Sequence, residues 1–211
     1  MNNYYDTNMK QIQTETIVKM RGIPLDPMTL KQAGIYPISY LYASFDKDIE
    51  EQVPLGDIVF QESSQIYVQN FEVKELSENK LLQSLENISS RKKEEALKGA
   101  DDAVSAYMAQ FSEVEKLTFP NQQKEVEAWL ADNTVATPVL DSLAEARGIT
   151  REEQIQKAVA KVQLFIPLSA KIIGTQQKYE DDIKAIKENE TMSLKDRIIA
   201  IKNLSFTYPT E

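Results

Sequence analysis

An acidic run near residue 50 is the densest group of potential metal ligands in the sequence. Residues 46–52 place four carboxylates at nearly alternate positions, a pattern typical of calcium-binding loops. A calcium loop also needs a glycine at its sharp turn and a closing glutamate, and the position where that glutamate would stand is Asp57. We therefore expect residues 46–52 to form an exposed, solvated loop and not a metal site.

A second acidic group follows much later in the chain. Glu180, Asp181 and Asp182 fall within a predicted helix, where consecutive side chains point in different directions, so they do not converge on one ion. A carboxylate-pair hydrolase would need two acids that converge in a cleft, and no sequence feature marks such a pair. We expect no catalytic residues and no metal ligands.

The composition excludes most other catalytic chemistry. The 211-residue chain has no histidine and no cysteine, which excludes the commonest general base, thiolate nucleophiles, disulfides and most zinc sites. It has no glycine-rich phosphate loop and no nucleophile elbow. We expect the single tryptophan, Trp129, and Phe119 and Phe165 to belong to the core and not to a ligand platform. The prediction is a protein without enzymatic activity and without a cofactor.

The charge of the chain argues against nucleic acid as a partner. With 24 basic and 33 acidic side chains the formal net charge is −9, which opposes the phosphate neutralisation that supplies most non-specific affinity for nucleic acid. The first twenty residues contain no apolar segment like that of a signal peptide, and no continuous apolar run is long enough to cross a membrane. We expect neither nucleic acid nor a membrane among the partners.

The composition divides the chain into parts whose strands and helices would position any site. Nine of the 17 aromatic residues lie in residues 1–75, whereas the remainder is rich in Ala, Leu, Glu and Lys. This predicts an α+β protein with a small N-terminal β-rich docking module at residues 1–75, a long helix and possible coiled coil at 76–118, and a helical bundle at 119–211.

Within the first module the local signals predict a hairpin and a short helix. Residues 57–61 and 65–73 are β-rich runs separated by a polar turn, which indicates a hairpin. Residues 27–32 form a short predicted helix that Gly34 would terminate. Residues 16–20 are predicted to form a short strand.

A heptad-like seam marks the predicted long helix. Its six apolar residues follow one another at spacings of 3, 4, 3, 4 and 3, and they form our candidate oligomer interface: Leu97, Ala100, Val104, Tyr107, Phe111 and Val114. A single long helix cannot bury these six apolar residues by itself. Either the following helices of the same chain cover it, or identical chains do, as in a trimeric stalk.

The remaining helices are predicted from residues that are typical of helix ends. Pro120 is expected to begin one helix, and Thr137 to cap a short helix that Gly148 terminates. Thr150 and Glu153 form a capping box that opens the next helix.

Proline and serine mark the last helical segments. Pro167 is expected to kink or break the helix that begins at Thr150, because it lacks a backbone donor and clashes with the preceding turn. Ser193 is expected to cap a final short helix, and the C-terminal tail is expected to be extended.

The order of these turn and cap motifs resembles phage tail-region proteins, a group of small proteins encoded beside tail-fibre genes. In the first part the resemblance rests on the segments Leu25-Asp26-Pro27-Met28-Thr29-Leu30 and Gly34-Ile35-Tyr36-Pro37-Ile38, and on Tyr67, Phe71, Val73 and Leu76-Ser77. In the second part it rests on Phe119-Pro120, Gln122, Glu125 and Trp129-Leu130, on Thr137-Pro138 and Leu140-Asp141, and on Ala146-Arg147-Gly148-Ile149. The sequence departs from the group at Gln32-Ala33, where an apolar residue is usual, and in its acidic rather than proline-rich loop.

The resemblance implies a virion or assembly role without catalytic residues. As a structural component, the protein would contact tail or tail-fibre proteins in the virion, with the β-rich module docking and the helices packing on neighbours, for example as a homo-oligomeric trimer. As a tail-fibre assembly chaperone, it would act in the host cytoplasm and be absent from the mature particle. A third hypothesis, a small carboxylate-based hydrolase on the tail, predicts a cleft with two converging acids.

Overall fold

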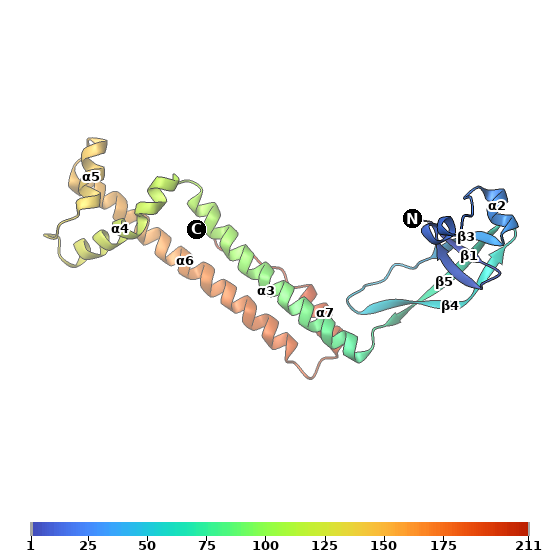
Figure 1. Ribbon diagram of the computed structural model, residues 1–211. Helices are drawn as coiled ribbons and strands as arrows, with labels where there is room; N and C mark the ends of the chain where they lie inside the picture. The colour runs from blue at the N-terminus through green and yellow to red at the C-terminus, as the bar shows by residue number, and fades with distance from the viewer. Residues whose placement is uncertain (1, 211) are drawn as a thin grey trace. The chain divides into compact units, whose positions relative to one another are not determined.

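The computed structural model describes residues 2–210 and has the predicted α+β architecture, with all strands in the first part of the chain and the long helices after them (Figure 1). The chain divides into two compact units, residues 1–84 and 85–211. Each unit is built around its own apolar residues and is described separately below.

The first unit is a five-stranded sheet with the strand order β2-β1-β3-β5-β4. Neighbouring strands are antiparallel except β3 and β5, which are parallel. The strands are β1 (Asn3–Asp6), β2 (Gln11–Thr14), β3 (Ile35–Leu41), β4 (Glu50–Gln61) and β5 (Ile66–Glu75). The predicted hairpin is confirmed as β4 and β5, and both strands are longer than the sequence indicated.

Two short helices, α1 (Glu15–Met20) and α2 (Pro27–Gln32), complete this unit. The prediction of a strand at residues 16–20 is wrong. The Thr14 hydroxyl accepts the amide of Ile17 and begins α1, and this N-cap outweighs the β-branched composition of the segment. The predicted helix at residues 27–32 is confirmed, with Asp26 as its N-cap and Gly34 at a φ of +71° just beyond its end.

The acidic segment at residues 46–52 is only partly the exposed loop that we expected. Glu50 to Gln52 already belong to β4 and pair with residues 73–75 of β5, while Ile49 is 6% exposed. Backbone pairing with β5 extends the strand into a run that lacks any apolar periodicity, and the Ile49 carbonyl accepts the amide of Leu76 just beyond it.

The second unit is built on two long helices. The helices of this part of the chain are α3 (Glu78–Met108), α4 (Glu113–Ala131), α5 (Pro138–Arg147), α6 (Arg151–Lys187) and α7 (Leu194–Lys202). In Figure 1, α3 and α6 run side by side in opposite directions, and α4 and α5 lie together at one end of the pair. We call α4, α5 and the adjoining start of α6 the helical head.

The predicted helix at residues 76–118 ends earlier than expected, at Met108. The Ser112 hydroxyl accepts the amide of Glu115 and begins α4, so Pro120 lies inside α4 and does not begin it. The prediction for Pro120 is therefore wrong, because the N-cap at Ser112, about two turns upstream, already starts the helix.

Several other helix boundaries are confirmed. Gly148 has a φ of +65° after α5, and the hydroxyls of Thr150 and Ser193 accept the amides three residues later. Thr137 stands at the N-cap position of α5, directly before Pro138, as predicted, but its side chain makes no capping hydrogen bond. Pro167 does not break α6, which continues to Lys187, and the proline itself is exposed.

Two apolar clusters matter for the surfaces described below. In the helical head, Val126 of α4, Leu140 of α5 and three residues of α6 are buried against one another, with Trp129 packed alongside. Along the helix pair, Ala100 of α3 is buried against Leu168 and Ile172 of α6. The head is therefore fixed to α6, and α6 to α3.

Candidate protein-binding surfaces

The six residues of the predicted seam have different environments. Ala100 is buried between the helices, and Val104 and Tyr107 pack against the same cluster, so α6 of the same chain covers the middle of the seam. Leu97 and Val114 are 52% and 73% exposed. Whether separate chains also meet here stays a prediction.

Phe111, the remaining seam residue, lies in the short connection between α3 and α4. Its ring contacts Tyr107 on one side and Phe119 of α4 on the other, with ring centroids 5.8 Å and 4.9 Å apart. Tyr107 in turn stacks on Phe165 of α6 at 5.3 Å. These four rings, contributed by three helices and the connection between two of them, line one side of a cavity.

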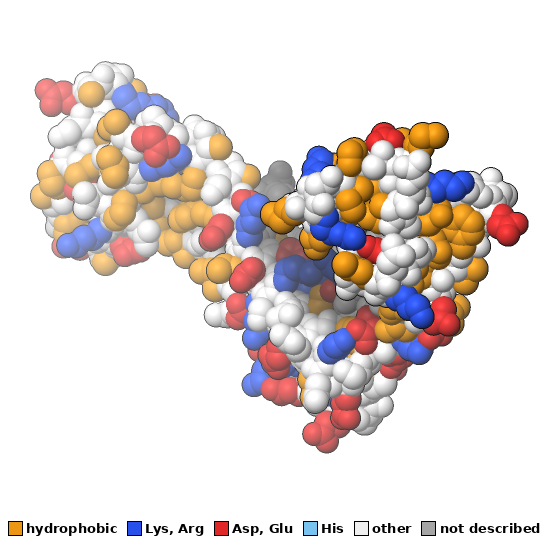
Figure 2. Space-filling view, turned by 45° about the vertical axis from the view of Figure 1, so that its right-hand side comes forward, with side chains coloured by type: hydrophobic (Ala, Val, Ile, Leu, Met, Phe, Trp, Pro, Cys, Tyr) orange, Lys and Arg blue, Asp and Glu red, His pale blue; other side chains and the backbone are white. Residues whose placement is uncertain are grey.

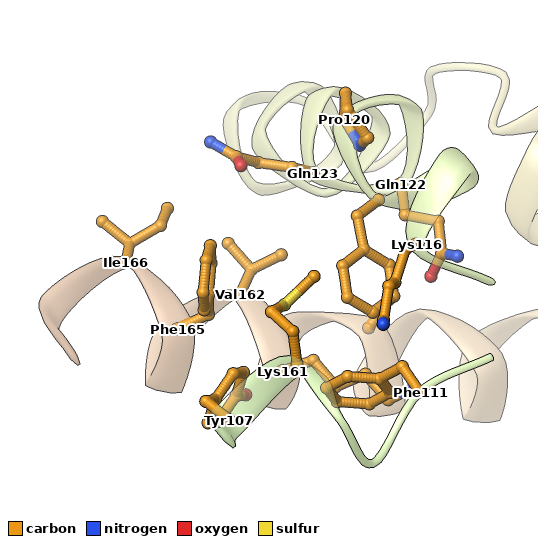
Figure 3. Close-up of a pocket in the computed structure, with 13 residues that line it drawn as sticks. Tyr107, Phe111, Lys116, Pro120, Gln122, Gln123, Lys161, Val162, Phe165 and Ile166 are labelled. Atoms are coloured by element: carbon orange, nitrogen blue, oxygen red, sulfur yellow. The ribbon is translucent and has the colours of Figure 1, made fainter. Parts of the chain in front are cut away.

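We call this cavity the apolar pocket; it has a volume of about 300 Å³ and lies where α4 crosses the pair of α3 and α6. Figure 3 shows Tyr107 and Phe165 side by side and Pro120 on the α4 wall. Its other apolar walls come from Val162 and Ile166 of α6. Among residues 2–210, no aspartate or glutamate lines the pocket.

Two lysines and two glutamines, Gln122 and Gln123, line the mainly apolar pocket. Lys161 Nζ lies 4.9 Å from the centre of the Phe111 ring and 2.6 Å from the Glu115 carboxylate. Lys116 is paired with Glu113 at 2.7 Å. Both ammonium groups are thus already neutralised, so the pocket presents mainly its apolar walls to a ligand.

The wall that α4 contributes is positioned by an interaction between helices. The Glu125 carboxylate of α4 accepts the amides of Val139 and Leu140, both at 2.9 Å, and so satisfies the first free amides of α5. Glu125 thus replaces the capping hydrogen bond that the Thr137 side chain does not make. Thr137 is instead fully buried, and Arg151 donates to its hydroxyl at 3.2 Å.

The helical unit exposes much more apolar surface than the pocket alone. Leu117 and Leu130 of α4 are 78% and 55% exposed, and Leu164 and Ile173 of α6 are 54% and 52% exposed. Figure 2 shows hydrophobic side chains gathered over the end of this unit that holds α4 and α5. Large exposed apolar areas mark sites of interaction in soluble proteins.

One window of α6 is, by length and composition, able to cross a membrane. Over 18 residues its mean hydropathy is 1.3, and only 22% of the window is buried within the chain. The prediction from the sequence did not find this segment, because two lysines and a proline interrupt the apolar run. The core helix of a soluble protein passes the same test, and α6 does pack against α3, α4 and α5.

After the pocket of the helical unit, a second unusual surface lies on the sheet unit, where aromatic rings form a row on one face of the sheet. Tyr5, Tyr36, Phe60 and Tyr67 contact one another with centroids 4.6–5.6 Å apart. A neighbouring group of Tyr40, Tyr42 and Phe71 extends the row. The opposite face holds Tyr4 and Ile35, which are buried against Val18 of α1 and Leu30 of α2.

The buried carboxylate of Asp6 in the sheet unit is paired and hydrogen-bonded by neighbouring residues. Burial of Asp6 opposes its ionisation, but hydrogen bonds from Arg21 and from the amides of Met9 and Asn8 outweigh that cost and hold its pKa below the ordinary value. Arg21 Nη1 lies 2.6 Å from the carboxylate. These contacts tie the loop after β1 to the end of α1, which is a structural role.

Comparisons with known proteins add no family to this description. No protein-family model matches the chain, and no curated protein and no solved structure matches it.

Among residues 2–210, no three acidic side chains are grouped so that they could hold a metal ion.

The sequence predicted only part of the pocket. Tyr107 and Phe111 were identified through the seam, whereas Phe119 and Phe165 were expected in the core and instead line the pocket. For Trp129 the expectation is confirmed, since it packs against the core of the head. The alternation of aromatic residues in β3 and β5 was the available signal for the row of rings on the sheet.

Proposed function

We propose that this chain is a non-enzymatic, phage tail-associated protein that acts through contacts with tail or tail-fibre proteins. The observation on which this rests is the apolar pocket, which is open, lined by aromatic rings and without carboxylates. Such a pocket accepts an apolar side chain of a partner protein, as the central pockets of protein interfaces do.

The surroundings of the pocket support a protein as its ligand. The exposed apolar residues of α4 and α6 extend beyond the pocket, so a partner could bury a wide area around one anchored side chain. Abundant charged side chains elsewhere would keep the free chain soluble. The tail association itself rests on the resemblance of the motif order.

An assembly chaperone is the second candidate for the same surface. A chaperone would cover apolar surface of a fibre protein through the pocket and leave before the particle is complete, so it would occur in the host cytoplasm and not in the virion. The hydrolase hypothesis finds no support at the pocket, where no pair of acids converges.

The test compares two variants of one helix. Ile166→Asp places a charge at the rim of the pocket, and Ile173→Asp places the same charge two turns later on α6 and outside the pocket. Both side chains are exposed, at 40% and 52%, so neither change should unfold the chain. The readout is the number of copies per purified particle of a phage that encodes the chain.

We expect Ile166→Asp to lower the number of copies per particle and Ile173→Asp to leave it near the wild-type value. Equal incorporation of both variants would overturn the assignment of the pocket as the docking site. Wild-type protein that is abundant in infected cells but missing from particles would favour the chaperone instead.

A further inference from the structure

A polar cavity lies beside the apolar pocket in the helical head. It has a volume of about 460 Å³, and α4 with its N-cap, α5 and the start of α6 supply its walls. Gln122 and Lys161, labelled in Figure 3, line both the cavity and the pocket, so the two spaces flank this pair of side chains. We call this second space the polar cavity.

Two cations of residues 2–210 line the polar cavity, and one of them has no acidic partner there. Lys161 is paired at 2.6 Å with Glu115, which also lines the cavity. Arg147 of α5 is exposed, and among residues 2–210 no carboxylate pairs with its guanidinium. The polar cavity therefore retains a positive charge that the described chain does not neutralise.

A buried glutamine orients the Arg147 guanidinium. Gln154 of α6 also lines the polar cavity and is 5% exposed, and its Oε1 accepts a hydrogen bond from Arg147 Nη1 at 2.8 Å. That bond uses one of the five N–H donors of a guanidinium. Further donors remain for a carboxylate, which a guanidinium holds through two parallel hydrogen bonds.

Apolar side chains border the charged wall of the polar cavity. Leu143 of α5 and Val114 of α4 line it, and Val114 is 73% exposed. These side chains would contact methylene groups next to a bound carboxylate. Aspartate and glutamate side chains have this combination of a short apolar stem and one negative charge.

We propose that the polar cavity binds an acidic side chain of the partner protein that places an apolar side chain in the apolar pocket. Charge complementarity selects this occupant, because the unpaired Arg147 guanidinium matches the single charge of a carboxylate, whereas a phosphate group carries more charge than this guanidinium offsets. The inference rests on the proposed function, since the two spaces adjoin and one partner would cover both.

Binding of a carboxylate is tested with butyrate, which has one carboxylate on a short apolar chain, and with butyramide, its uncharged counterpart. Both are titrated into the isotope-labelled full chain, and the side-chain NMR signals of Arg147 and Gln154 are followed. The variant Arg147→Gln removes the cation. The control Lys124→Gln removes a positive charge from an exposed position of α4 outside both spaces, and circular dichroism checks that each variant keeps its helix content.

We expect wild type and Lys124→Gln to bind butyrate about tenfold more tightly than butyramide. The signals of Arg147 and Gln154 should shift together, because the two side chains are hydrogen-bonded to each other. In Arg147→Gln the preference for butyrate should be lost. Equal binding of butyrate and butyramide by wild type, or equal shifts at the other arginines of the chain, would overturn the carboxylate site.

The number of copies per purified phage particle tests whether the partner uses this site. Arg147→Gln should lower that number, as Ile166→Asp should, and Lys124→Gln should leave it near the wild-type value. A loss in Ile166→Asp without a loss in Arg147→Gln would overturn this inference and leave the proposed function intact. No loss in either variant would overturn both.

Discussion

Replacement of Asp6 by asparagine tests how the sheet unit is held together. The Asp6 side chain is fully buried and accepts hydrogen bonds from Arg21 at 2.6 Å, from Gln13 at 3.1 Å and from the amides of Asn8 and Met9 at 2.9 and 3.0 Å. Asparagine has nearly the same shape but no charge, and its amide group cannot accept from all these donors.

The expected loss follows from these contacts. A hydrogen bond to a charged group contributes about 1.5–3 kcal/mol, and breaking a buried ion pair costs about 3–5 kcal/mol. The Arg21 side chain is 31% exposed, so it can regain water when its partner is lost, which lowers the cost. We expect Asp6→Asn to reduce the free energy of unfolding of the sheet unit by about 2–4 kcal/mol at pH 7.

The effect should depend on pH in a defined direction. Because the folded pKa of Asp6 lies below its unfolded value, its contribution is complete above the unfolded pKa of about 3.9 and is lost as the pH falls through the folded pKa. The asparagine variant does not titrate at this position. The stability difference between wild type and variant should therefore shrink below about pH 4.

The assay is amide hydrogen exchange of β1 and β3 in native conditions, with Trp129 fluorescence as a separate probe of the helical unit. Asp26→Asn is the matched control, because asparagine caps a helix about as well as aspartate, so α2 should keep its stability. Unchanged protection of β1 and β3 in Asp6→Asn, or a difference that persists at low pH, would refute this account of the buried carboxylate.

Three further predictions concern the helical unit. Gly148→Ala should lower the stability of the head by about 1 kcal/mol in urea unfolding followed by tryptophan fluorescence, since a φ of +65° disfavours a side chain; an unchanged midpoint would count against that cap. Glu125→Gln should cost about 1 kcal/mol in the same assay, because the charged acceptor at the start of α5 is lost; no loss would show that water caps this helix equally well. Gly99→Ala would bring a Cβ to within 2.5 Å of the Tyr208 ring and should release the C-terminal tail, which carboxypeptidase digestion would detect as faster cleavage. Gly174→Ala, where no atom lies within 4 Å, is its control and should digest like wild type.

The sequence predicted those features of the fold that depend on neighbouring residues. The caps at Thr150 and Ser193 and the positive φ of Gly148 follow from short-range backbone chemistry, and all three are confirmed. The β4–β5 hairpin was predicted for a similar reason, because its polar turn separates two β-rich runs.

Two local predictions failed because a competing local signal was overlooked. Ser112 with Glu115 three residues later has the sequence pattern of a capping box, and the Ser112 hydroxyl begins α4 before Pro120 is reached. Thr14 likewise caps a helix in a segment that β-branched residues had suggested as a strand. In both cases the chain contained the relevant signal, and the prediction gave more weight to another.

The pocket could not be predicted from spacing, because its walls meet only after folding. Tyr107 and Phe165 are far apart in the chain and stack because α3 and α6 run in opposite directions. The periodicity of α3 correctly indicated an apolar face, but it could not show that α6 of the same chain covers the middle of that face and leaves Leu97 exposed.

Quantitative peptide mass spectrometry of purified phage particles tests the central claim most directly. Peptides of this chain would be measured against a tail protein of known copy number, in particles of a phage whose genome encodes the chain. The proposed role as a structural tail component predicts a stoichiometric signal that survives purification. Absence from the particles, with the protein present in infected cells, would contradict it.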